Sequence, residues 1–562
     1  MHDDPSTLLG QPSEGSLSLC RPELYIALFV FIAAVLVTAF RVPPILDFPN
    51  HFARISLISG GIDQSFFHTA YVLDWSRART NIGIDLLAYW LGPMIGPDLL
   101  ARSLLFLAIV LPPLGAIALN RRLFGRNQPF HVGILFLAWS TTLIAGFINF
   151  QIGLGLALMF ALIDLKIGQN NILRMSFWRF AASLILTLDH VFAAGFYLVL
   201  SAGLELPAQF GDLSKRNALK ATAGRIALAG MAGLAPVVAL TLSAKGLPGD
   251  EGNIGLTWNS PLSAISNFLS AISSYFTLAD IALFTPIIFI VVEARSRKQI
   301  HFHAGLLVAA AFLLGLSLIS PRHAMGTGWI SWRFPIMTLL TAAAAICPFP
   351  EAGRGLRCRL VATLVAAIFL RTGLVAGLWW QGSRDTAAVE NVLASLPPES
   401  KVLPIMRFPA RRFGWQHASR HFFENENTIR HLPALATLDA GAFVPTLFTA
   451  VGKQPLQVTE EFRSIAVPEG NLLPPGALFC ADMQAFYEPF TPYLANWRHK
   501  FDYVLVVNAD SPDMFVGSAL PSGLRELANG GFAALYGIDK SDVRPTTDAQ
   551  KNCPAPQTVY PN

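Results

Sequence analysis

The stretch LYIALFVFIAAVLVTAFRVPPILDFPNH, residues 24–51, predicts a membrane helix that opens directly into a loop. Residues 24–40 are continuously apolar and approach the length of ~20 residues that crosses a bilayer. The segment exceeds the usual apolar region of a signal peptide, and no small-x-small cleavage site follows it. Instead it continues into Arg41-Val-Pro-Pro. We therefore expect a transmembrane helix that the mature protein retains.

The composition of the whole chain agrees with a membrane protein. Of its 562 residues, 53% are hydrophobic and only 14% are charged, and the mean hydropathy is +0.48. Soluble domains carry about 25% charged residues. These values exclude a soluble enzyme, a disordered chain and a disulfide scaffold. The net charge of +5 does not imply nucleic acid as a partner, because cytoplasmic loops of membrane proteins concentrate Lys and Arg.

Hydropathy predicts an all-α membrane bundle of about 11 transmembrane helices with a small C-terminal α/β domain. Several spans are short, and the region 176–206 is either one broken helix or a hairpin of two helices. The candidate spans are residues 24–40, 98–119, 129–146, 148–165, 176–188, 191–206, 221–242, 277–294, 303–320, 333–348 and 360–380.

The distribution of basic residues orients these spans. One set of alternating loops holds sixteen Lys and Arg residues, whereas the opposite short loops after the first hold only Lys245, Arg322 and Arg333. This asymmetry is the positive-inside signal, and it requires that 176–206 cross twice. It places the N-terminus in the cytoplasm and the C-terminal domain outside. The sixteen are Arg121, Arg122, Arg126, Lys166, Arg174, Arg179, Lys215, Arg216, Lys220, Arg225, Arg295, Arg297, Lys298, Arg354, Arg357 and Arg359.

The expected organisation has three parts. Residues 1–23 form a disordered cytoplasmic tail, residues 24–382 the transmembrane domain, and residues 383–562 an extracytoplasmic α/β domain. The transmembrane domain includes the long outer loop 41–97, which ends in an interfacial helix, IGIDLLAYWLGPMIG. The loop 243–276 contains a second amphipathic surface helix, NSPLSAISNFLSAISSYF. In the C-terminal domain, ESKVLPI, FDYVLVV and FAALYGI read as short strands.

Asp47 is the main candidate for chemistry. It follows the first span on the outer side, between Pro44 and Pro49, which stiffen the turn. A partly desolvated carboxylate there can act as a general base or bind a metal. His51 and Arg54 are spaced i, i+3 and share a face if a helix starts near residue 50. Alternatively, Asp47 or the asparagine at 50 only caps that helix.

This arrangement resembles the C-type (GT-C) integral-membrane glycosyltransferases. The resemblance rests on the long outer loop after the first helix, its DFPNH segment, the many short paired helices and the C-terminal domain. It implies that Asp47 activates the acceptor or binds a metal, and that the transfer inverts the anomeric carbon of a hexosyl or pentosyl group. The next acids in the loop are Asp63 and Asp74, so the paired acids of many members have no close counterpart. No cofactor is assigned, and a divalent cation stays open.

The donor follows from the short cytoplasmic loops. They lack a DxD motif and any phosphate-binding domain, so an outer-face transferase must draw its sugar from a polyprenyl-phosphate carrier in the bilayer. Cations near the outer headgroups would then hold the phosphate. Arg322, His323 and Arg333, in PRHAMGTGWISWRFP, are the candidates. The alternative is anchoring in an aromatic belt with Trp329 and Trp332.

Ionisable residues at membrane depth usually face a cavity or pair with each other. Asp189 and His190, at the tip of an outward hairpin, either line the substrate site or form a packing pair. Arg371 lies in the middle of a span and should pair with an acid or a lipid phosphate. Asp164 is expected to form an interfacial ion pair with Lys166.

In the C-terminal domain, His417 and His421 are spaced i, i+4, with Glu424 nearby. This spacing permits a metal site on a helix, although a solvated helix face is the simpler interpretation. Cys480 and Cys553 lie on the same predicted outer side, where a disulfide is permitted.

Three classes of function fit the sequence. The leading one is an inner (plasma) membrane glycosyltransferase that moves a sugar from a polyprenyl-phosphate donor to a glycan, lipid or protein acceptor outside the cytoplasm. In it, Asp47 and His51 are catalytic, and Arg54, Asp189, His190, Arg322, His323 and Arg333 bind substrate. The others are a transporter or flippase for lipid-linked saccharides and a non-catalytic subunit of an envelope polysaccharide system. A transporter would show inverted repeats and paired midplane charges.

Overall fold

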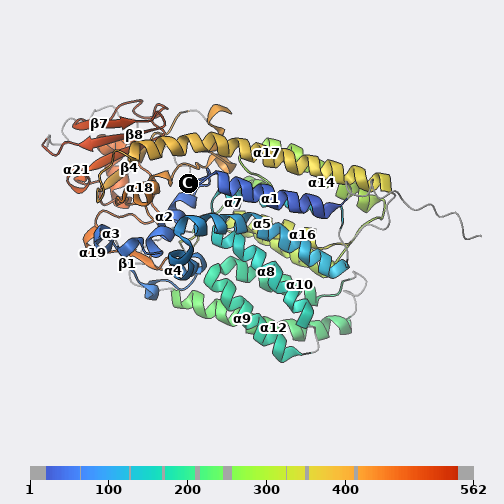
Figure 1. Cartoon of the computed structure of the whole chain (residues 1–562). Coiled ribbons are helices and arrows are strands. Elements are labelled where there is room, and N and C mark those ends of the chain that lie inside the picture. Colours follow the sequence, from blue (N-terminus) through green and yellow to red (C-terminus); the bar gives the residue numbers. More distant parts are fainter. Residues whose placement is uncertain are drawn as a thin grey trace, which may run out of the picture.

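The computed structural model describes residues 21–63, 65–125, 128–167, 171–208, 216–244, 256–324, 326–347, 354–410 and 415–541. Within them the protein is mostly helical, and a small sheet region lies at one end of the helical bundle (Figure 1). The expected tail 1–23 falls almost wholly outside these residues.

Long helices form the bundle. They pack through side chains that are apolar on nearly every face, as expected for helices that contact both one another and lipid. The helices are α1 (Pro22–Ala39), α5 (Pro97–Phe124), α8 (Ile148–Ile167), α9 (Ile172–Asp189), α10 (Val191–Glu205), α12 (Arg216–Ala244), α14 (Thr277–Ser296), α15 (Ala304–Ile319), α16 (Arg333–Ala344) and α17 (Arg354–Leu393).

Six helices of the described chain are long and apolar enough to cross a membrane, so the protein is a multi-pass membrane protein. They are α1, α5, α8, α14, and the segments Thr222–Ser243 of α12 and Cys358–Leu393 of α17. Several other expected spans form shorter helices. The predicted total of about 11 spans therefore stays a prediction.

The region 176–206 forms two helices, as the charge pattern requires. The helix α9 ends at Asp189, and α10 begins at Val191. His190 between them has an extended backbone, and its Nδ1 accepts a hydrogen bond from the Phe192 amide, which caps α10. This helical hairpin brings the residues at its tip to the same end of the bundle as the C-terminal domain.

The expected span 129–146 is not one regular helix, which corrects the prediction. It consists of the short helices α6 (His131–Ile134) and α7 (Thr141–Ile144), with a 3-10 turn over Leu135–Ala138 between them. The guanidinium of Arg371 donates to the carbonyls of Phe136 and Trp139 at this interruption. A buried side chain from α17 thus satisfies backbone groups that a continuous helix would satisfy itself.

Arg371 also makes the acid pair that its depth predicts. Its Nε lies 2.7 Å from Oδ1 of Asp280 in α14, and both side chains are buried. Asp164 differs from the prediction, because its ion-pair partner is Arg179 at 3.1 Å rather than Lys166. Tyr197 also donates a hydrogen bond to Asp164. In each case a buried charge is matched by a cation from a neighbouring helix.

The first outer loop folds into short elements: α2 (Phe48–Ile58), α3 (Ser65–Ala70), β1 (Tyr71–Leu73) and α4 (Gly83–Ile95). As predicted for an interfacial helix, α4 exposes large apolar side chains, Trp90 and Met94 among them. In the second loop, α13 (Pro261–Ser266) has exposed apolar side chains, Leu262 and Ile265. The following 3-10 segment Asn267–Ala271 and Tyr275 are largely buried, so the predicted surface helix is correct only in its first half.

The C-terminal region carries a four-stranded sheet in the order β4-β6-β8-β7. The strands β4 (Val402–Met406), β6 (Tyr503–Val507) and β8 (Ala533–Ile538) coincide with the three expected runs, and β7 (Leu524–Asn529) was not predicted. The strand β4 pairs parallel to β6, whereas β8 pairs antiparallel to β6 and β7. The helices of the C-terminal region are α18 (Leu435–Ala440), α19 (Glu460–Arg463), α20 (Ala481–Tyr487) and α21 (Trp497–Lys500).

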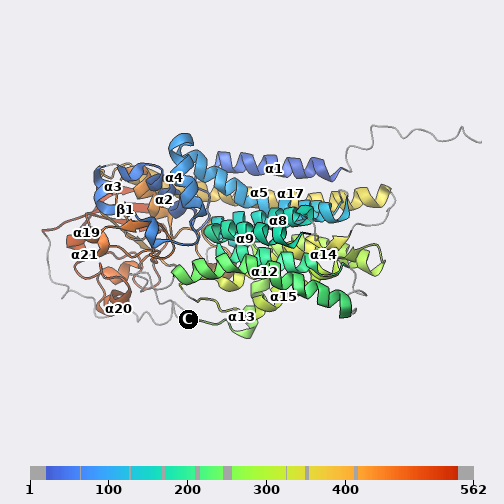
Figure 2. The same cartoon turned by 90° about the horizontal axis from the view of Figure 1, so that it is seen from below.

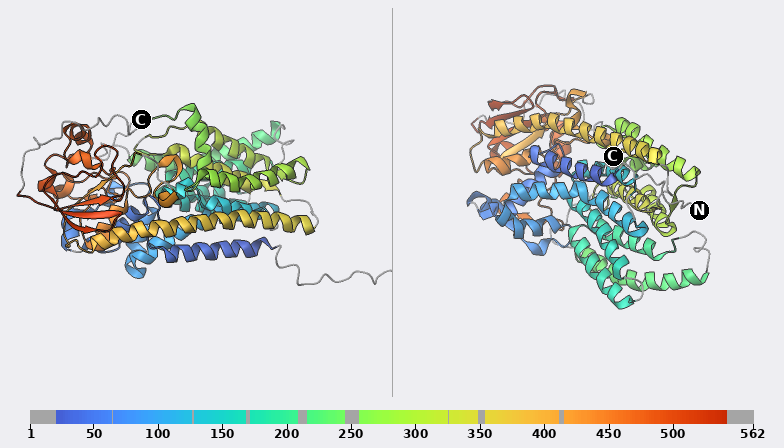
Figure 3. Two further views of the ribbon diagram at one scale, coloured as in Figure 1. Left: turned by 90° about the horizontal axis from the view of Figure 1, so that it is seen from above. Right: turned by 45° about the vertical axis from the view of Figure 1, so that its right-hand side comes forward.

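Two connections join this region to the membrane bundle. The helix α17 runs without a break from the far end of the bundle to the sheet, alongside α1 (Figure 3). The strand β1 of the first outer loop pairs antiparallel with β5 (Leu456–Val458), with Tyr71 opposite Val458. As a result the outer loop and the C-terminal region lie together at one end of the molecule (Figure 2).

Candidate functional site

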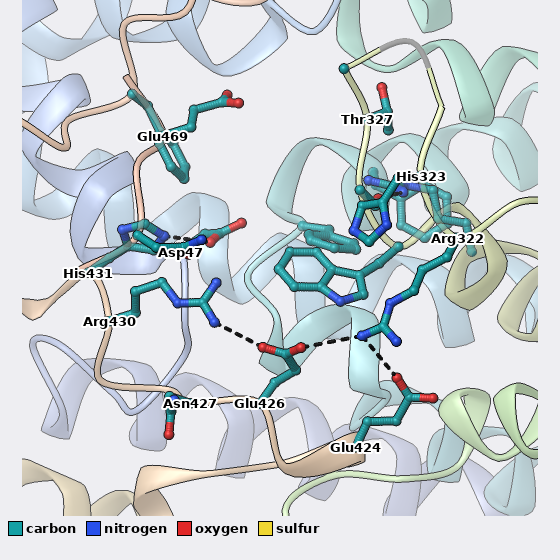
Figure 4. Close-up of a pocket in the computed structure, with 18 of the residues that line it drawn as sticks. Asp47, Arg322, His323, Thr327, Glu424, Glu426, Asn427, Arg430, His431 and Glu469 are labelled. Atoms are coloured by element: carbon teal, nitrogen blue, oxygen red, sulfur yellow. Dashed lines mark hydrogen bonds and ion pairs between the residues drawn. The ribbon is translucent and has the colours of Figure 1, made fainter. Parts of the chain in front are cut away.

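A cavity with a volume of about 1190 Å³ lies where the outer loop, the bundle and the C-terminal region meet. Its walls come from the Asp47 turn, the bundle segments 147–150 and 190–192, the loop 322–333, and the C-terminal segments 424–431 and 453–472. Charged side chains of the outer loop, of the loop 322–333 and of the C-terminal region project into this cavity (Figure 4).

The backbone of Asp47 is held by hydrogen bonds to the end of α7. Its amide donates to the Ala145 carbonyl, and the Leu46 amide donates to the Ile144 carbonyl. Gly146 has φ +85°, and a Cβ at this glycine would lie 2.7 Å from the Asp47 nitrogen. A glycine is therefore needed for the close approach of the two chains. The side chain of Asp47 makes no hydrogen bond that caps α2, which argues against a role as a helix cap.

The environment of the Asp47 carboxyl raises its pKa to about 7. Burial is the largest cause of the raised pKa, and the negative charge of Glu469 acts in the same direction. The positive charges of Arg430, Arg333 and Arg54 oppose it by favouring the carboxylate. A carboxyl whose pKa lies near neutrality can both accept and release a proton at working pH.

Two histidines, His431 and His51, line the cavity together with this carboxyl. Nε2 of His431 lies 3.4 Å from Oδ1 of Asp47. His51 lies on α2 with its ring edge against Phe448, at a centroid distance of 5.3 Å. Burial lowers the pKa of His51 well below its ordinary value, and burial also lowers the pKa of His431, to about 3. Both rings are neutral at physiological pH.

Arg333 is a buried cation in the cavity wall. One guanidinium nitrogen donates to the Gly328 carbonyl at 2.6 Å, and the group lies over the rings of Phe147 and Phe192 at 4.5 and 5.1 Å. Among the described residues, no carboxylate lies within ion-pair distance of Arg333. Buried charges are normally paired, so the geometry leaves this one available to an anion that enters the cavity.

Arg322 and His323 also line the cavity but are already engaged. Arg322 lies 3.5 Å from Glu424 and 3.6 Å from Glu426. Nδ1 of His323 lies 2.8 Å from the Thr257 hydroxyl. Any anion that binds Arg322 must compete with two carboxylates, which makes Arg333 the better placed of the two arginines.

The cavity gathers six of the eight residues singled out in the sequence: Asp47, His51, His190, Arg322, His323 and Arg333. Arg54 and Asp189 are not among its lining residues. Arg54 is fully buried and pairs with Asp85 of α4 at 2.7 Å. Asp189 is buried against Gly83 and Gly153. Of the two residues predicted to share a helix face, His51 therefore reaches the cavity and Arg54 does not.

The sequence does not predict the contribution of the C-terminal region to the cavity. Arg430 and His431 lie beside Asp47, and Glu426 connects Arg430 to Arg322 across the cavity (Figure 4). Glu469 is held by Lys453 and Gln454. The polar run ENENTIRH, residues 424–431, was the available signal, but nothing in the sequence relates it to the first outer loop.

The described residues contain no group of three or more His, Cys, Asp or Glu side chains arranged to hold a metal ion. The backbone of His417 is not helical. His417 and His421 therefore do not share a helix face, contrary to the prediction. Glu424 instead faces Arg322. Cys480 is buried, and because Cys553 lies outside the described residues, their pairing stays a prediction.

Comparison with known proteins gives a structural likeness only. No family model matches the chain, and no curated protein matches it. The crystal structure of ArnT from Cupriavidus metallidurans bound to undecaprenyl phosphate is similar over 92% of this chain and 97% of that chain, with a TM-score of 0.50 and 12% identity. The apo structure of the same protein covers the same shares with a TM-score of 0.48 and 12% identity.

ArnT is a polytopic membrane glycosyltransferase of the GT-C class. The likeness covers nearly the whole of both chains, so it includes the outer loop and the C-terminal region as well as the bundle. The resemblance expected from the DFPNH segment and the loop architecture is therefore confirmed at the level of structure: the chain has a fold like that of the GT-C membrane glycosyltransferases.

Proposed function

We propose that the protein is a membrane glycosyltransferase that moves a sugar from a polyprenyl-phosphate carrier to an acceptor hydroxyl. The observation that carries this proposal is the presence, in one cavity, of the Asp47 carboxyl and of the Arg333 guanidinium, which has no carboxylate partner among the described residues. The structural neighbour is bound to undecaprenyl phosphate, which supports a donor of that class.

The reaction follows from the roles of these two groups. The Asp47 carboxylate takes the proton from the acceptor hydroxyl as its oxygen attacks the anomeric carbon of the donor. The bond between that carbon and the phosphate oxygen breaks, and the phosphate leaves with the electron pair. Arg333 stabilises the negative charge that develops on the leaving phosphate. Attack opposite the leaving group inverts the anomeric carbon.

The topology fits this reaction. We propose that the N-terminus is cytoplasmic, that the cavity and the region 383–562 face the outside, and that the protein resides in the inner (plasma) membrane. A divalent cation is not needed for any step derived above. A glycan, lipid or protein can supply the acceptor hydroxyl.

The test separates binding from transfer. Purified protein is incubated with an extract of polyprenyl-phosphate-linked saccharides and acceptors from the source membranes, and the release of undecaprenyl phosphate is measured by mass spectrometry. Asp47→Asn should reduce release about 10²–10⁴-fold, the range expected for loss of a general base. It should still bind undecaprenyl phosphate, whereas Arg333→Met should bind it at least ten-fold more weakly.

Asp63→Asn is the matched control, because Asp63 is an exposed aspartate in the same outer loop. It should retain wild-type release. Full release by Asp47→Asn would contradict the role of Asp47 as the base, and absence of release by the wild-type protein would contradict the transferase assignment and favour a non-catalytic subunit. Uptake of labelled lipid-linked saccharide into proteoliposomes without release of undecaprenyl phosphate would favour a transporter instead.

A further inference from the structure

His431 connects the C-terminal region to the carboxyl that the proposed mechanism uses. It follows Arg430 in the turn before the short helix Leu432–Ala434, and its side chain is buried. Nε2 of its ring faces Oδ1 of Asp47 at 3.4 Å (Figure 4). Whether this nitrogen carries a hydrogen decides whether it can donate to the carboxylate or only repel it.

The structure fixes the orientation of a neighbouring amide. Oδ1 of Asn50 accepts a hydrogen bond from the backbone amide of Phe448 at 2.8 Å. Nδ2 of Asn50 donates to the Thr446 carbonyl at 3.0 Å. Both partners are backbone groups whose roles cannot be exchanged, so the amide of Asn50 cannot be flipped without loss of both bonds.

The amide in turn fixes the tautomer of His431. Nδ2 of Asn50 lies 3.3 Å from Nδ1 of His431. Because an amide NH₂ group can only donate, Nδ1 must act as the acceptor and carry no hydrogen. Burial keeps the pKa of the ring at about 3, so at neutral pH its single hydrogen resides on Nε2, which faces Asp47.

We propose that His431 is a positioning residue for Asp47, and that Asn50 holds it in the tautomer that donates from Nε2 to the carboxylate. This inference rests on the proposed function. One carboxylate oxygen is oriented by His431, which leaves the other to accept the proton of the acceptor hydroxyl. The C-terminal region therefore completes the catalytic constellation, rather than only covering it.

A positioning role for His431 predicts a specific change in the pH dependence of the release rate. A donor to the carboxylate favours its ionised form, so removal of that donor raises the pKa of Asp47. The other charged groups that act on Asp47 are Arg54 of α2, Arg333 of α16, and Arg430 and Glu469 of the C-terminal region. The titratable ring of His51 lines the same cavity. They stay in place in a His431 variant.

The experiment compares variants in the same release assay, from pH 5 to pH 9. His431→Leu removes the donor. The acidic limb of its pH–rate profile, where the rate falls as Asp47 is protonated, should move to higher pH by about one unit. His431→Gln restores an amide donor of similar reach, and its limb should return towards the wild-type position. Asn50→Leu leaves the ring but frees its tautomer, and its limb should move in the same direction as that of His431→Leu by a smaller amount.

His303→Ala is the matched control. His303 is also a buried histidine, and it caps α15 far from Asp47 in the sequence by accepting from the Leu306 amide. Its loss should lower stability without moving the limb. A limb that stays in place in both His431→Leu and Asn50→Leu, or identical limbs in His431→Leu and His431→Gln, would overturn the positioning role. Neither result would affect the proposed function, whose own tests are the release of undecaprenyl phosphate by the wild-type protein and the loss of that release in Asp47→Asn.

Discussion

At the scale of the residue, the Asp47 carboxyl is balanced between burial, which opposes its charge, and nearby cations, which favour it. Because the ionised form is the base, the rate should fall as the pH drops below about 7. Glu469 and Arg430 carry opposite charges, so neutralising each of them should shift this acidic limb of the pH profile in opposite directions.

Glu469→Gln removes a negative charge, so the pKa of Asp47 should fall and the acidic limb should move to lower pH. Arg430→Gln removes a positive charge, so the pKa and the limb should move up. The measurement is the pH profile of undecaprenyl phosphate release, with the exposed Glu461→Gln as control. Shifts in the same direction for both variants would show that these charges do not act on the base.

A second prediction at this scale concerns the buried pair of Arg371 and Asp280. Arg371→Met leaves the Asp280 carboxylate without its cation and removes donors from backbone carbonyls, so unfolding in detergent should become easier by about 3–5 kcal/mol. Arg297→Met is the control, because Arg297 forms an exposed pair with Glu293 and should change stability by about 0.5 kcal/mol or less. Equal thermal stability of the two variants would contradict this account.

At the scale of the element, the Asp47 turn rests on the glycine after α7. Gly146→Ala would place a Cβ 2.7 Å from the Asp47 nitrogen and 2.8 Å from its Cβ, so the turn must move. Since a displacement of about 1 Å in a catalytic group costs on the order of 10²-fold in rate, release should fall strongly.

Gly125→Ala is the matched control for this variant. Gly125 has nearly the same positive φ, +82°, but nothing lies within 4 Å of the added methyl group. Both variants carry backbone strain of about 1 kcal/mol, and only Gly146→Ala should lose activity disproportionately. Equal activity in the two would mean that the turn tolerates displacement.

The elements also show which parts of the site the sequence could predict. The hairpin of α9 and α10 was predictable, because only two crossings keep the basic residues on one side. Asp47 was predictable from its position after the first span. The spacing of His51 and Arg54 predicted that both would lie in the site. Two residues on one helix face need not reach the same cavity, and Arg54 forms an ion pair with Asp85 instead.

The contribution of the C-terminal region could not be predicted. Asn50 and His431 are 381 residues apart in the chain, and no local pattern relates positions at such a separation. The strands β1 and β5 that bring the two segments together have three residues each, too few for a recognisable alternation. Short strands of this kind are defined by their partner rather than by their own sequence.

At the scale of the whole molecule, the proposed reaction requires that the cavity face the outside. Ser541→Cys, at an exposed site near the sheet, should react with a membrane-impermeant maleimide in intact cells. Arg297→Cys, in one of the basic loops expected in the cytoplasm, should react only after the membrane is made permeable. The unsubstituted protein provides the background from native cysteines, and the reverse pattern would place the site in the cytoplasm.

An experimental structure of the protein with undecaprenyl phosphate would test whether Arg333 and Asp47 serve one reaction. The phosphate should lie within about 3 Å of the Arg333 guanidinium, in the cavity that contains the Asp47 carboxyl, with room between them for a sugar and an acceptor hydroxyl. A phosphate bound outside this cavity, or an Asp47 side chain that points away from it, would contradict the account.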